Sequence, residues 1–290
     1  MPLAGVAAAL TTVLIWASFL VTLRFAMTRD FSQGAVLMMR FLPAALLLAP
    51  IILRTGLRPA GVPVWQLAII VLGSGVPFYY LISLGLSYSS ASDAGVLAPG
   101  TLPLLIAVAS FFILAERFST LRLIGFAMIL CGGLMIGLWD VLTAAADGAW
   151  RGHIMIVIAV CGWALYTVVF RISGLGALDG AAITIAWSSI FVIPIGFGLG
   201  VSTGDAGWVE VLMVVFVQGV LGGAVALISF GYSVRLLGAS RTAAFTALTP
   251  VLVLICGIVF LGEPVSEVKI AGVLSVSAGV FFASGVMDRS

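Results

Sequence analysis

The 290-residue chain contains very little charge. Asp, Glu, Lys and Arg make up 8% of its residues and leave a formal net charge of +2, whereas about 25% of the residues of an ordinary soluble domain are charged. Hydrophobic residues account for 62%. A soluble fold needs a polar surface around its core, so this composition excludes a soluble globular domain, and the small net charge does not indicate a nucleic-acid partner. Lipid suits such a chain, because a helix crosses the hydrocarbon layer with about 20 apolar residues.

The chain also lacks the residue clusters that catalysis or metal binding requires. His153 is the single histidine, and Cys131, Cys161 and Cys256 lie in apolar runs without zinc-ligand or redox spacing. The sequence contains no pair of carboxylates within an apolar run and no glycine-rich phosphate loop. We therefore predict a protein that is not an enzyme, that binds no metal or cofactor, and that is not driven directly by ATP.

Charged residues and helix breakers divide the chain into ten apolar runs, each long enough to cross a bilayer. The predicted fold class is therefore an all-α integral membrane protein with ten transmembrane helices. The expected spans are 3–28, 32–54, 63–87, 91–115, 119–138, 151–172, 178–201, 208–236, 239–262 and 266–286.

The same pattern of residues occurs twice along the chain, at a fixed offset of 147 positions. Each copy holds five spans, and an odd number makes the second copy enter the bilayer from the opposite side. This predicts two inverted five-helix repeats, an internal symmetry common in secondary transporters. We expect the first repeat over 1–139, a connecting loop over 140–150 and the second repeat over 151–290. The matching pairs are Trp16 and Trp163, Arg24 and Arg171, Gly75 and Gly222, Pro103 and Pro250, Glu116 and Glu263, Ser119 and Ser266, Gly125 and Gly272, and Gly132 and Gly279.

Basic residues near the span ends predict the orientation, because cytoplasmic loops carry an excess of Lys and Arg. With the N-terminus inside, eight basic residues lie inside and four outside. We therefore expect a multi-pass protein of a bacterial inner membrane with both termini in the cytoplasm. The inside set is Arg54, Arg58, Arg117, Arg122, Arg171, Arg235, Arg241 and Arg289, and the outside set is Arg24, Arg29, Arg151 and Lys269.

The fourth and fifth spans of each copy carry a recurring motif. The first copy runs through Pro103 to Leu-Ala-Glu116-Arg-Phe-Ser119, and the second runs through Pro250 to Leu-Gly-Glu263-Pro-Val-Ser266. Together with Arg40-Phe-Leu in the second span, this pattern resembles the EamA-type repeat of the drug/metabolite transporter superfamily over nearly the whole chain. Within that superfamily, the chain is most similar to the YddG-type exporters of aromatic amino acids.

The resemblance implies ten helices, both termini inside, and a central cavity lined by spans 1, 3, 4, 6, 8 and 9, with spans 5 and 10 peripheral. The second repeat departs from the first at one informative position, where Trp187 replaces Arg40. We therefore do not expect the two halves to bind substrate symmetrically.

Helix breakers mark candidate hinges in the spans that the resemblance places at the centre. Proline removes a backbone hydrogen bond, and in lipid the freed carbonyl needs another partner, so breaks are expected beside cavities or tight helix contacts. Plain packing is the alternative explanation, and it weighs least at Pro99-Gly100. The candidate hinge residues are Pro77, Pro99, Gly100 and Pro250.

Aromatic residues in the middle of the same spans predict a substrate site. A buried Trp or Tyr needs a partner for its polar group, so the lipid-facing middle of the bilayer suits it poorly. Trp65, Trp139, Trp150 and Trp208 instead suit the membrane interface. We predict that one central cavity is lined by Trp16, Phe78, Tyr79, Thr101, Trp163, Tyr166, Thr246 and Thr249.

Arg40 is the one charge well inside a predicted span. A charge there is costly and must face protein or water. It can bind a substrate carboxylate or hold helices together through backbone carbonyls, and we favour the structural role. For Glu116 and Glu263 we favour fixing the turn before the next helix over carrying protons, with Ser119 and Ser266 as N-caps.

These features favour a secondary transporter that exports small metabolites, with aromatic or apolar amino acids as the leading class. An exporter of drugs, nucleosides or organic acids and a non-transporting membrane enzyme or scaffold are the alternatives. The expected partners are a small-molecule substrate and the lipid bilayer, and we expect the protein to function as a monomer. Because the acids and His153 lie at span ends, we predict transport down the substrate's own gradient or by exchange rather than proton coupling.

Overall fold

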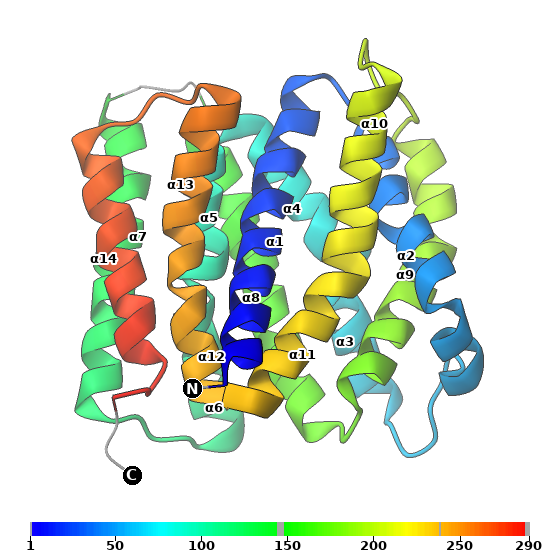
Figure 1. The fold of residues 1–290 in the computed structure, drawn as a ribbon, viewed down its shortest axis with the longest axis horizontal. Helices are drawn as coiled ribbons and strands as arrows, with labels where there is room; N and C mark the ends of the chain where they lie inside the picture. Colours follow the sequence, from blue (N-terminus) through cyan, green and yellow to red (C-terminus); the bar gives the residue numbers. More distant parts are fainter. Residues whose placement is uncertain (1, 144–147, 238, 288–290) are drawn as a thin grey trace.

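The computed structural model describes residues 2–143, 148–237 and 239–287, and every secondary-structure element in these ranges is a helix (Figure 1). The first half contains α1 (Leu3–Thr28), α2 (Gln33–Thr55), α3 (Val64–Ser74), α4 (Val76–Tyr88), α5 (Ala91–Gly95), the π-helical segment η1 (Val96–Gly100), α6 (Leu102–Leu114) and α7 (Thr120–Thr143). The second half contains α8 (Ala149–Ile172), α9 (Ala177–Gly198), α10 (Trp208–Val214), the π-helical η2 (Val215–Val225), α11 (Ala226–Leu237), α12 (Ala239–Thr246), α13 (Leu248–Leu261) and α14 (Glu267–Ala283).

Ten helical runs correspond to the ten predicted spans. Within the described ranges, nine of them are long and apolar enough to cross a membrane. The tenth, α14, has 17 residues, about 26 Å at 1.5 Å per residue, and stands beside α7 (Figure 1). The clearest boundary difference is that α7 continues to Thr143, so the predicted 140–150 loop overlaps both α7 and α8. Residues 144–147 of that loop lie outside the described part of the chain.

The two halves are related by an internal two-fold symmetry, which is most direct where α7 meets α14. A Cβ on Gly125 would lie 2.6 Å from the carbonyl oxygen of Gly279, and a Cβ on Gly132 would lie 2.7 Å from that of Gly272. Gly125 corresponds to Gly272, and Gly132 to Gly279, so the two contacts are one contact repeated. Between them, Ser275 donates a 3.0 Å hydrogen bond to the carbonyl of the residue 147 positions earlier. The two helices run antiparallel, as an inverted repeat requires.

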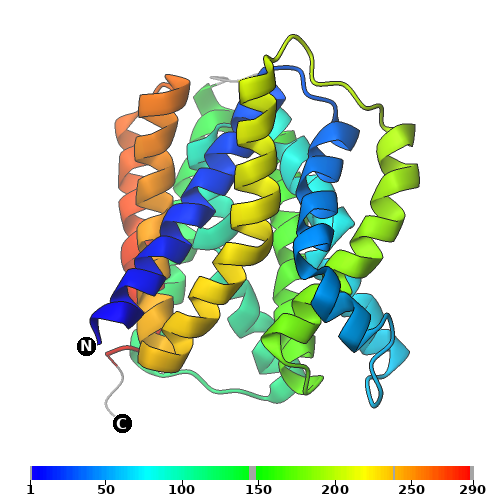
Figure 2. The same ribbon diagram turned by 45° about the vertical axis from the view of Figure 1, so that its right-hand side comes forward.

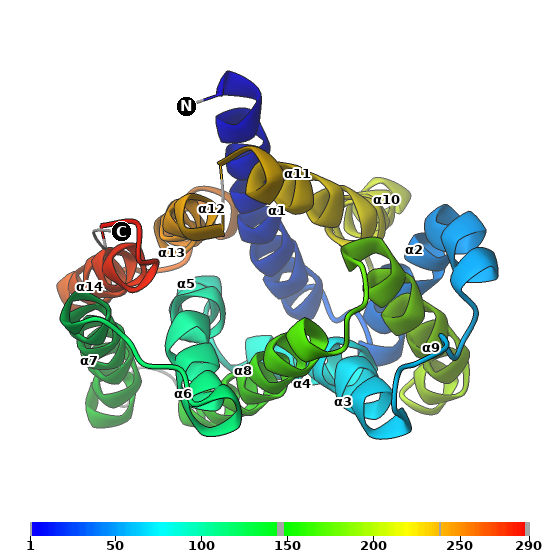
Figure 3. The same ribbon diagram turned by 90° about the horizontal axis from the view of Figure 1, so that it is seen from below.

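The other helices follow the same symmetry. Span 2 packs against span 7 (α2 on α9). Span 1 lies beside span 8 (α1 with η2 and α11), and the equivalent pair in the other repeat, spans 6 and 3, lies side by side in the same way (α8 with α3 and α4) (Figure 2). Seen from below, α7 and α14 form one edge of the molecule, and α2 and α9 lie at the opposite edge (Figure 3). The spans that the resemblance places around a cavity therefore lie between these edges, and spans 5 and 10 are peripheral.

Four spans are interrupted at positions that correspond in the two repeats. Span 3 breaks at Gly75 (φ −99°, ψ −146°), and span 8 contains η2 at the matching place. Span 4 contains η1 around Pro99, where the wider π-turn accommodates the missing N–H. Span 9 breaks at Ala247, just before Pro250 in the first turn of α13, where a helix tolerates proline. The breaks are observed, while their motion as hinges remains a prediction.

The two ends of the molecule differ in how spans 4 and 9 meet. We call the end at which α1 begins and α14 ends the lower end, and the opposite one the upper end (Figure 1). Toward the upper end α5 packs on α13, where a Cβ on Gly95 would lie 2.8 Å from the Cβ of Val253. The corresponding elements toward the lower end are α12 and α6, and these lie apart (Figure 3). Spans 4 and 9 therefore meet above and diverge below.

Candidate functional site

A chain of aromatic rings connects the two repeats. Phe78 of α4 and Trp163 of α8 have ring centroids 4.5 Å apart, and Tyr166 continues the chain 5.4 Å from Trp163. The helices approach closely because two glycines face each other: a Cβ on Gly73 would lie 2.4 Å from the carbonyl oxygen of Gly162. The ring of Tyr79 adjoins that of Phe78, with centroids 5.0 Å apart. Four predicted site residues thus form one aromatic cluster: Phe78, Tyr79, Trp163 and Tyr166.

Tyr79 links this cluster to the charge inside span 2. The guanidinium carbon of Arg40 lies 4.3 Å from the centroid of the Tyr79 ring, and Nη2 of Arg40 donates a hydrogen bond to the Tyr79 hydroxyl. Phe19 of α1 and Phe41 of α2 pack edge-on against the same ring, with centroids 5.6 Å and 5.4 Å away. Arg40 is 6% exposed, so its charge is held within the protein, as its cost in a membrane requires.

Arg40 also binds the backbone of η2. Its Nη1 donates to the carbonyl of Gln218, and its Nη2 donates to the carbonyl of Gly222 at 3.2 Å. A π-helical turn changes which carbonyls accept hydrogen bonds within the helix. In η2, the carbonyls of Gln218 and Gly222 accept hydrogen bonds from the guanidinium. Among the described residues, the buried Nε of Arg40 has no hydrogen-bond partner. The structural contact is therefore observed, and binding of a substrate carboxylate remains a prediction.

Gln218 belongs to this site, although sequence reasoning missed it. Its side chain is fully buried, and its Nε2 donates a 2.9 Å hydrogen bond to the carbonyl of Phe19 on α1. Its Oε1 is buried with no partner in the described part of the chain. The available signal was an amide inside an apolar run, directly before Gly219.

The other four predicted site residues are Trp16, Thr101, Thr246 and Thr249. Trp16 stacks on Phe230 of α11 with centroids 5.7 Å apart. Thr101, after η1, donates to the carbonyl of Leu97 at 2.6 Å, and its methyl group faces Gly133 of α7. Thr246 donates to the carbonyl of Ala243 at 2.7 Å, just before the break in span 9. Thr249 is fully buried, and its hydroxyl has no partner among the described residues.

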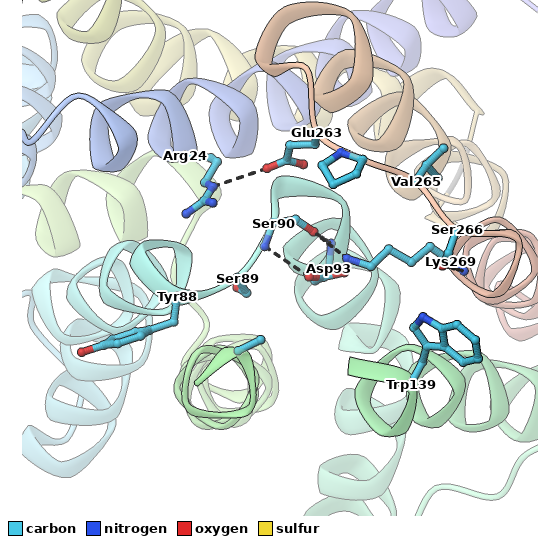
Figure 4. Close-up of a pocket in the computed structure, with 12 residues that line it drawn as sticks. Arg24, Tyr88, Ser89, Ser90, Asp93, Trp139, Glu263, Val265, Ser266 and Lys269 are labelled. Atoms are coloured by element: carbon cyan, nitrogen blue, oxygen red, sulfur yellow. Dashed lines mark hydrogen bonds and ion pairs between the residues drawn. The ribbon is translucent and has the colours of Figure 1, made fainter. Parts of the chain in front are cut away.

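A second group of polar residues lies at the upper end (Figure 4). Asp93 and Lys269 form an ion pair with Oδ1 and Nζ 2.8 Å apart, and Nε2 of His153 lies 3.7 Å from Oδ2 of Asp93. Asp93 also accepts the backbone N–H of Ser90 at 3.2 Å, which caps α5. Asp93 and His153 are at span ends, as predicted, yet their side chains are buried. Asp93 lies against His153 of α8 and Lys269 of α14.

A pocket of about 310 Å³ lies beside this group (Figure 4). Its lining includes two ion pairs, Arg24 with Glu263 and Lys269 with Asp93, together with Tyr88 and Trp139. Its charged side chains already bond to one another or to the backbone. Within the described residues, no three His, Cys, Asp or Glu side chains group as a metal site requires.

The two predicted turn-fixing glutamates instead connect the repeats. Spans 4 and 9 end in left-handed residues, Ala115 (φ 53°) and Gly262 (φ 63°), which turn the chain just before each glutamate. Glu263 pairs with Arg24 of α1, and Glu116 pairs with Arg171 of α8. The turn-fixing interpretation is therefore wrong for the carboxylates, which reach across to the other repeat. The predicted N-caps are confirmed: Ser119 accepts the N–H of Arg122 at 3.3 Å, and Ser266 that of Lys269 at 3.2 Å.

Comparisons with known proteins agree with the two-repeat architecture. The model of the EamA-like transporter family matches residues 3–138 and again residues 150–285. The chain is 28% identical over 215 residues to the uncharacterized transporter YetK of Bacillus subtilis (strain 168), a match covering 70% of this chain and 63% of YetK. It is 25% identical over 213 residues to the uncharacterized transporter YcxC of the same organism, covering 70% of this chain and 67% of YcxC.

A protein of known crystal structure shares the fold. It superimposes with a TM-score of 0.63 at 20% sequence identity, and the match covers 99% of each chain. At this identity the likeness shows the fold alone.

Proposed function

This chain belongs to the EamA-like transporter family, and we propose that it exports small metabolites by alternating access, with aromatic or apolar amino acids as substrates. The family and the names of its relatives indicate a multi-pass membrane transporter rather than an enzyme. The observation that carries the substrate proposal is the aromatic cluster of Phe78, Tyr79, Trp163 and Tyr166 beside the buried guanidinium of Arg40.

The chemistry of the cluster suits a substrate with an apolar or aromatic side chain and a carboxylate. Aromatic pairs contribute about 0.5–1.5 kcal/mol beyond their buried area, and a guanidinium donates to carboxylates in a fixed planar geometry. Phe78 and Trp163 belong to different repeats and touch. A substrate bound against both rings would contact both repeats and would therefore favour whichever arrangement of the repeats fits it best.

Orientation and energy supply complete the proposal. The arginine distribution supports a bacterial inner membrane with both termini, and hence the lower end, in the cytoplasm. We propose that the protein works as a monomer without a cofactor, down the gradient of its substrate or by exchange. Among the described residues the buried acid is Asp93, which lies at the upper end and is held by Lys269.

Counterflow in proteoliposomes tests this function. Vesicles loaded with unlabelled phenylalanine, leucine, a nucleoside or an organic acid should take up labelled phenylalanine strongly only when loaded with one of the amino acids, without a pH or sodium gradient. Strong uptake driven by the nucleoside or the organic acid would assign the alternative substrate class. Uptake that requires an imposed proton gradient would contradict the proposed energy supply.

A further inference from the structure

Two inter-repeat ion pairs in this structure are one interaction in two copies. Arg24 corresponds to Arg171 at the 147-residue offset, and Glu263 corresponds to Glu116. Arg24 pairs with Glu263 at the upper end with 3.4 Å between Nε and Oε1, and Arg171 pairs with Glu116 at the lower end with 2.7 Å between Nη1 and Oε1. The symmetry of the fold therefore places the same chemical group at both ends of the molecule.

At the upper end the carboxylate joins three parts of the protein. Both oxygens of Glu263 accept the backbone N–H of Ala91, at 2.9 Å and 3.0 Å, and Arg24 also donates to the carbonyl of Leu86 at 2.5 Å. Ala91 is the first residue of α5, where unpaired N–H groups and the helix dipole favour an anion. We call the contacts among Arg24, Glu263 and the Ala91 N–H the upper link. It holds α1 and α5 to the end of α13.

At the lower end the ion pair between Arg171 and Glu116 is in place, and the residue that corresponds to Ala91 lies outside the described part of the chain. The side chains of Arg171 and Glu116 are 64% and 31% exposed, against 22% and 10% for Arg24 and Glu263. The helix that corresponds to α5 is α12, and α12 lies apart from α6, whose end leads to Glu116 (Figure 3). An exposed ion pair alone contributes about 0–1 kcal/mol, so in this conformation it adds little.

We propose that Glu263 and Glu116 are positioning residues of transport, which cap α5 and α12 alternately. In this structure Glu263 holds the start of α5 and closes the upper end. In the opposite conformation Glu116, already paired with Arg171, receives the start of α12 and closes the lower end, while α5 leaves Glu263. The proposal rests on alternating access, which is part of the proposed function, but it requires no particular substrate.

The upper end carries a further interaction that the lower end cannot repeat. Lys269 binds Asp93 on α5 and donates to the hydroxyl of Ser90 at 3.3 Å. The positions that correspond to Asp93 and Lys269 are occupied by Ser240 and Arg122, so the acid is missing from the second copy. Closure of the upper end is therefore stabilised by more contacts than closure of the lower end, in agreement with the conformation observed.

Distance measurements between two spin labels test the proposal in the full-length protein. The labels replace Tyr88, which precedes α5, and Glu267, at the start of α14; both are exposed at the upper end. The three native cysteines are replaced by alanine. The Glu263→Gln variant should shift the ratio of long to short distances toward long by about tenfold, because hydrogen bonds to a charged group are lost. The Glu210→Gln variant removes the charge from the ion pair with Arg29 at the same end and should leave the ratio unchanged.

The decisive variant combines both substitutions. Glu116→Gln weakens closure of the lower end. The double variant Glu116→Gln/Glu263→Gln should therefore return the distances toward those of the labelled protein that retains both glutamates. A double variant that equals or exceeds the Glu263→Gln shift would overturn the proposal. So would a Glu263→Gln variant with unchanged distances. If Glu263→Gln does not purify as a monodisperse protein, Arg24→Gln with Arg24→Gln/Arg171→Gln gives the same comparison. If the single variant shifts the distances and the double variant reverses that shift, but the protein shows no amino-acid counterflow, the alternating caps stand and the proposed substrate class is rejected.

Discussion

Arg40 and Trp187 occupy equivalent positions in spans 2 and 7, yet they have different neighbours. Arg40 points to η2 and Tyr79. Trp187 donates its indole N–H to the carbonyl of Leu57 at 2.9 Å, stacks on Phe191 with centroids 5.8 Å apart, and packs against the apolar cluster between α3 and α9. The backbone symmetry is thus retained, while among the described residues the buried charge of the central region is Arg40 of the first repeat.

This difference separates two requirements of a transporter. In the proposed alternating access, the inverted repeat would supply two conformations built from the same contacts. The α7–α14 pairing is the most symmetric of the contacts in this structure. The proposed substrate, an amino acid with an apolar or aromatic side chain, would need a site with one charged end, whereas a strictly symmetric centre would place a charge on both sides. Replacing an arginine by a tryptophan in one copy keeps the helix packing and leaves a single guanidinium beside the aromatic cluster.

The largest effect is expected from Arg40→Met, which removes the buried guanidinium that the first repeat supplies to the central region. The carbonyls of Gln218 and Gly222 would remain buried without this donor, at a cost of about 1–3 kcal/mol each. We expect a lower unfolding temperature in detergent and transport reduced by more than tenfold. Arg40→Lys should recover only part of the loss, because an ammonium lacks the planar fork. Wild-type stability and transport in Arg40→Met would show that the two positions are interchangeable.

Trp163→Ala should have the next largest effect, because it removes the ring of the second repeat that packs on Phe78. Trp163 contacts Phe78 and Tyr166, and each ring pair contributes about 0.5–1.5 kcal/mol. The apparent affinity measured by counterflow should fall roughly tenfold. Trp208→Ala is the matched control, since that side chain is 74% exposed and suits the membrane interface. Equal losses in the two variants would count against a substrate site at the cluster.

Gly100→Leu should slow transport to an intermediate degree. A Cβ on Gly100 would lie 2.5 Å from Cγ1 of Val276 on α14, so added bulk restricts the break in span 4. We expect a several-fold lower turnover with normal expression. The corresponding position of the second repeat already carries a side chain, Ala247, and Ala247→Gly serves as the comparison. Unchanged turnover in Gly100→Leu would leave the break with a packing role only.

The smallest effect is expected from Trp187→Phe. The variant loses the hydrogen bond to the Leu57 carbonyl, about 1 kcal/mol, and keeps an aromatic ring against Phe191. Counterflow should stay within about twofold of the wild type, with a slightly lower unfolding temperature. A loss as large as that of Arg40→Met would mean that the second repeat contributes equally to the site.

Much of the fold could be predicted from local properties of the sequence. The spans follow from the length of apolar chain that a bilayer requires, which is why the bounds of α1 and α5 match the predicted starts at residues 3 and 91. The 147-residue offset predicted the repeats, and proline and glycine predicted the breaks at Gly75 and Pro99. Phe78, Tyr79, Trp163 and Tyr166 were chosen as aromatic residues of central spans, and the structure brings them together.

Contacts between distant helices were decided only by the tertiary structure. Nothing near Glu263 in the chain indicates that it bonds the N–H of Ala91 and the side chain of Arg24, and the same holds for Gln218 against Phe19. Thr101 was predicted to line the central cavity, yet its methyl group faces α7, which is one of the peripheral spans. Hydrophobic length and breaker residues act within one helix, whereas the partner of a polar side chain depends on how two helices cross and in which register. That register is set by many small contacts such as Gly73 against Gly162, which become definite only when all ten spans pack together.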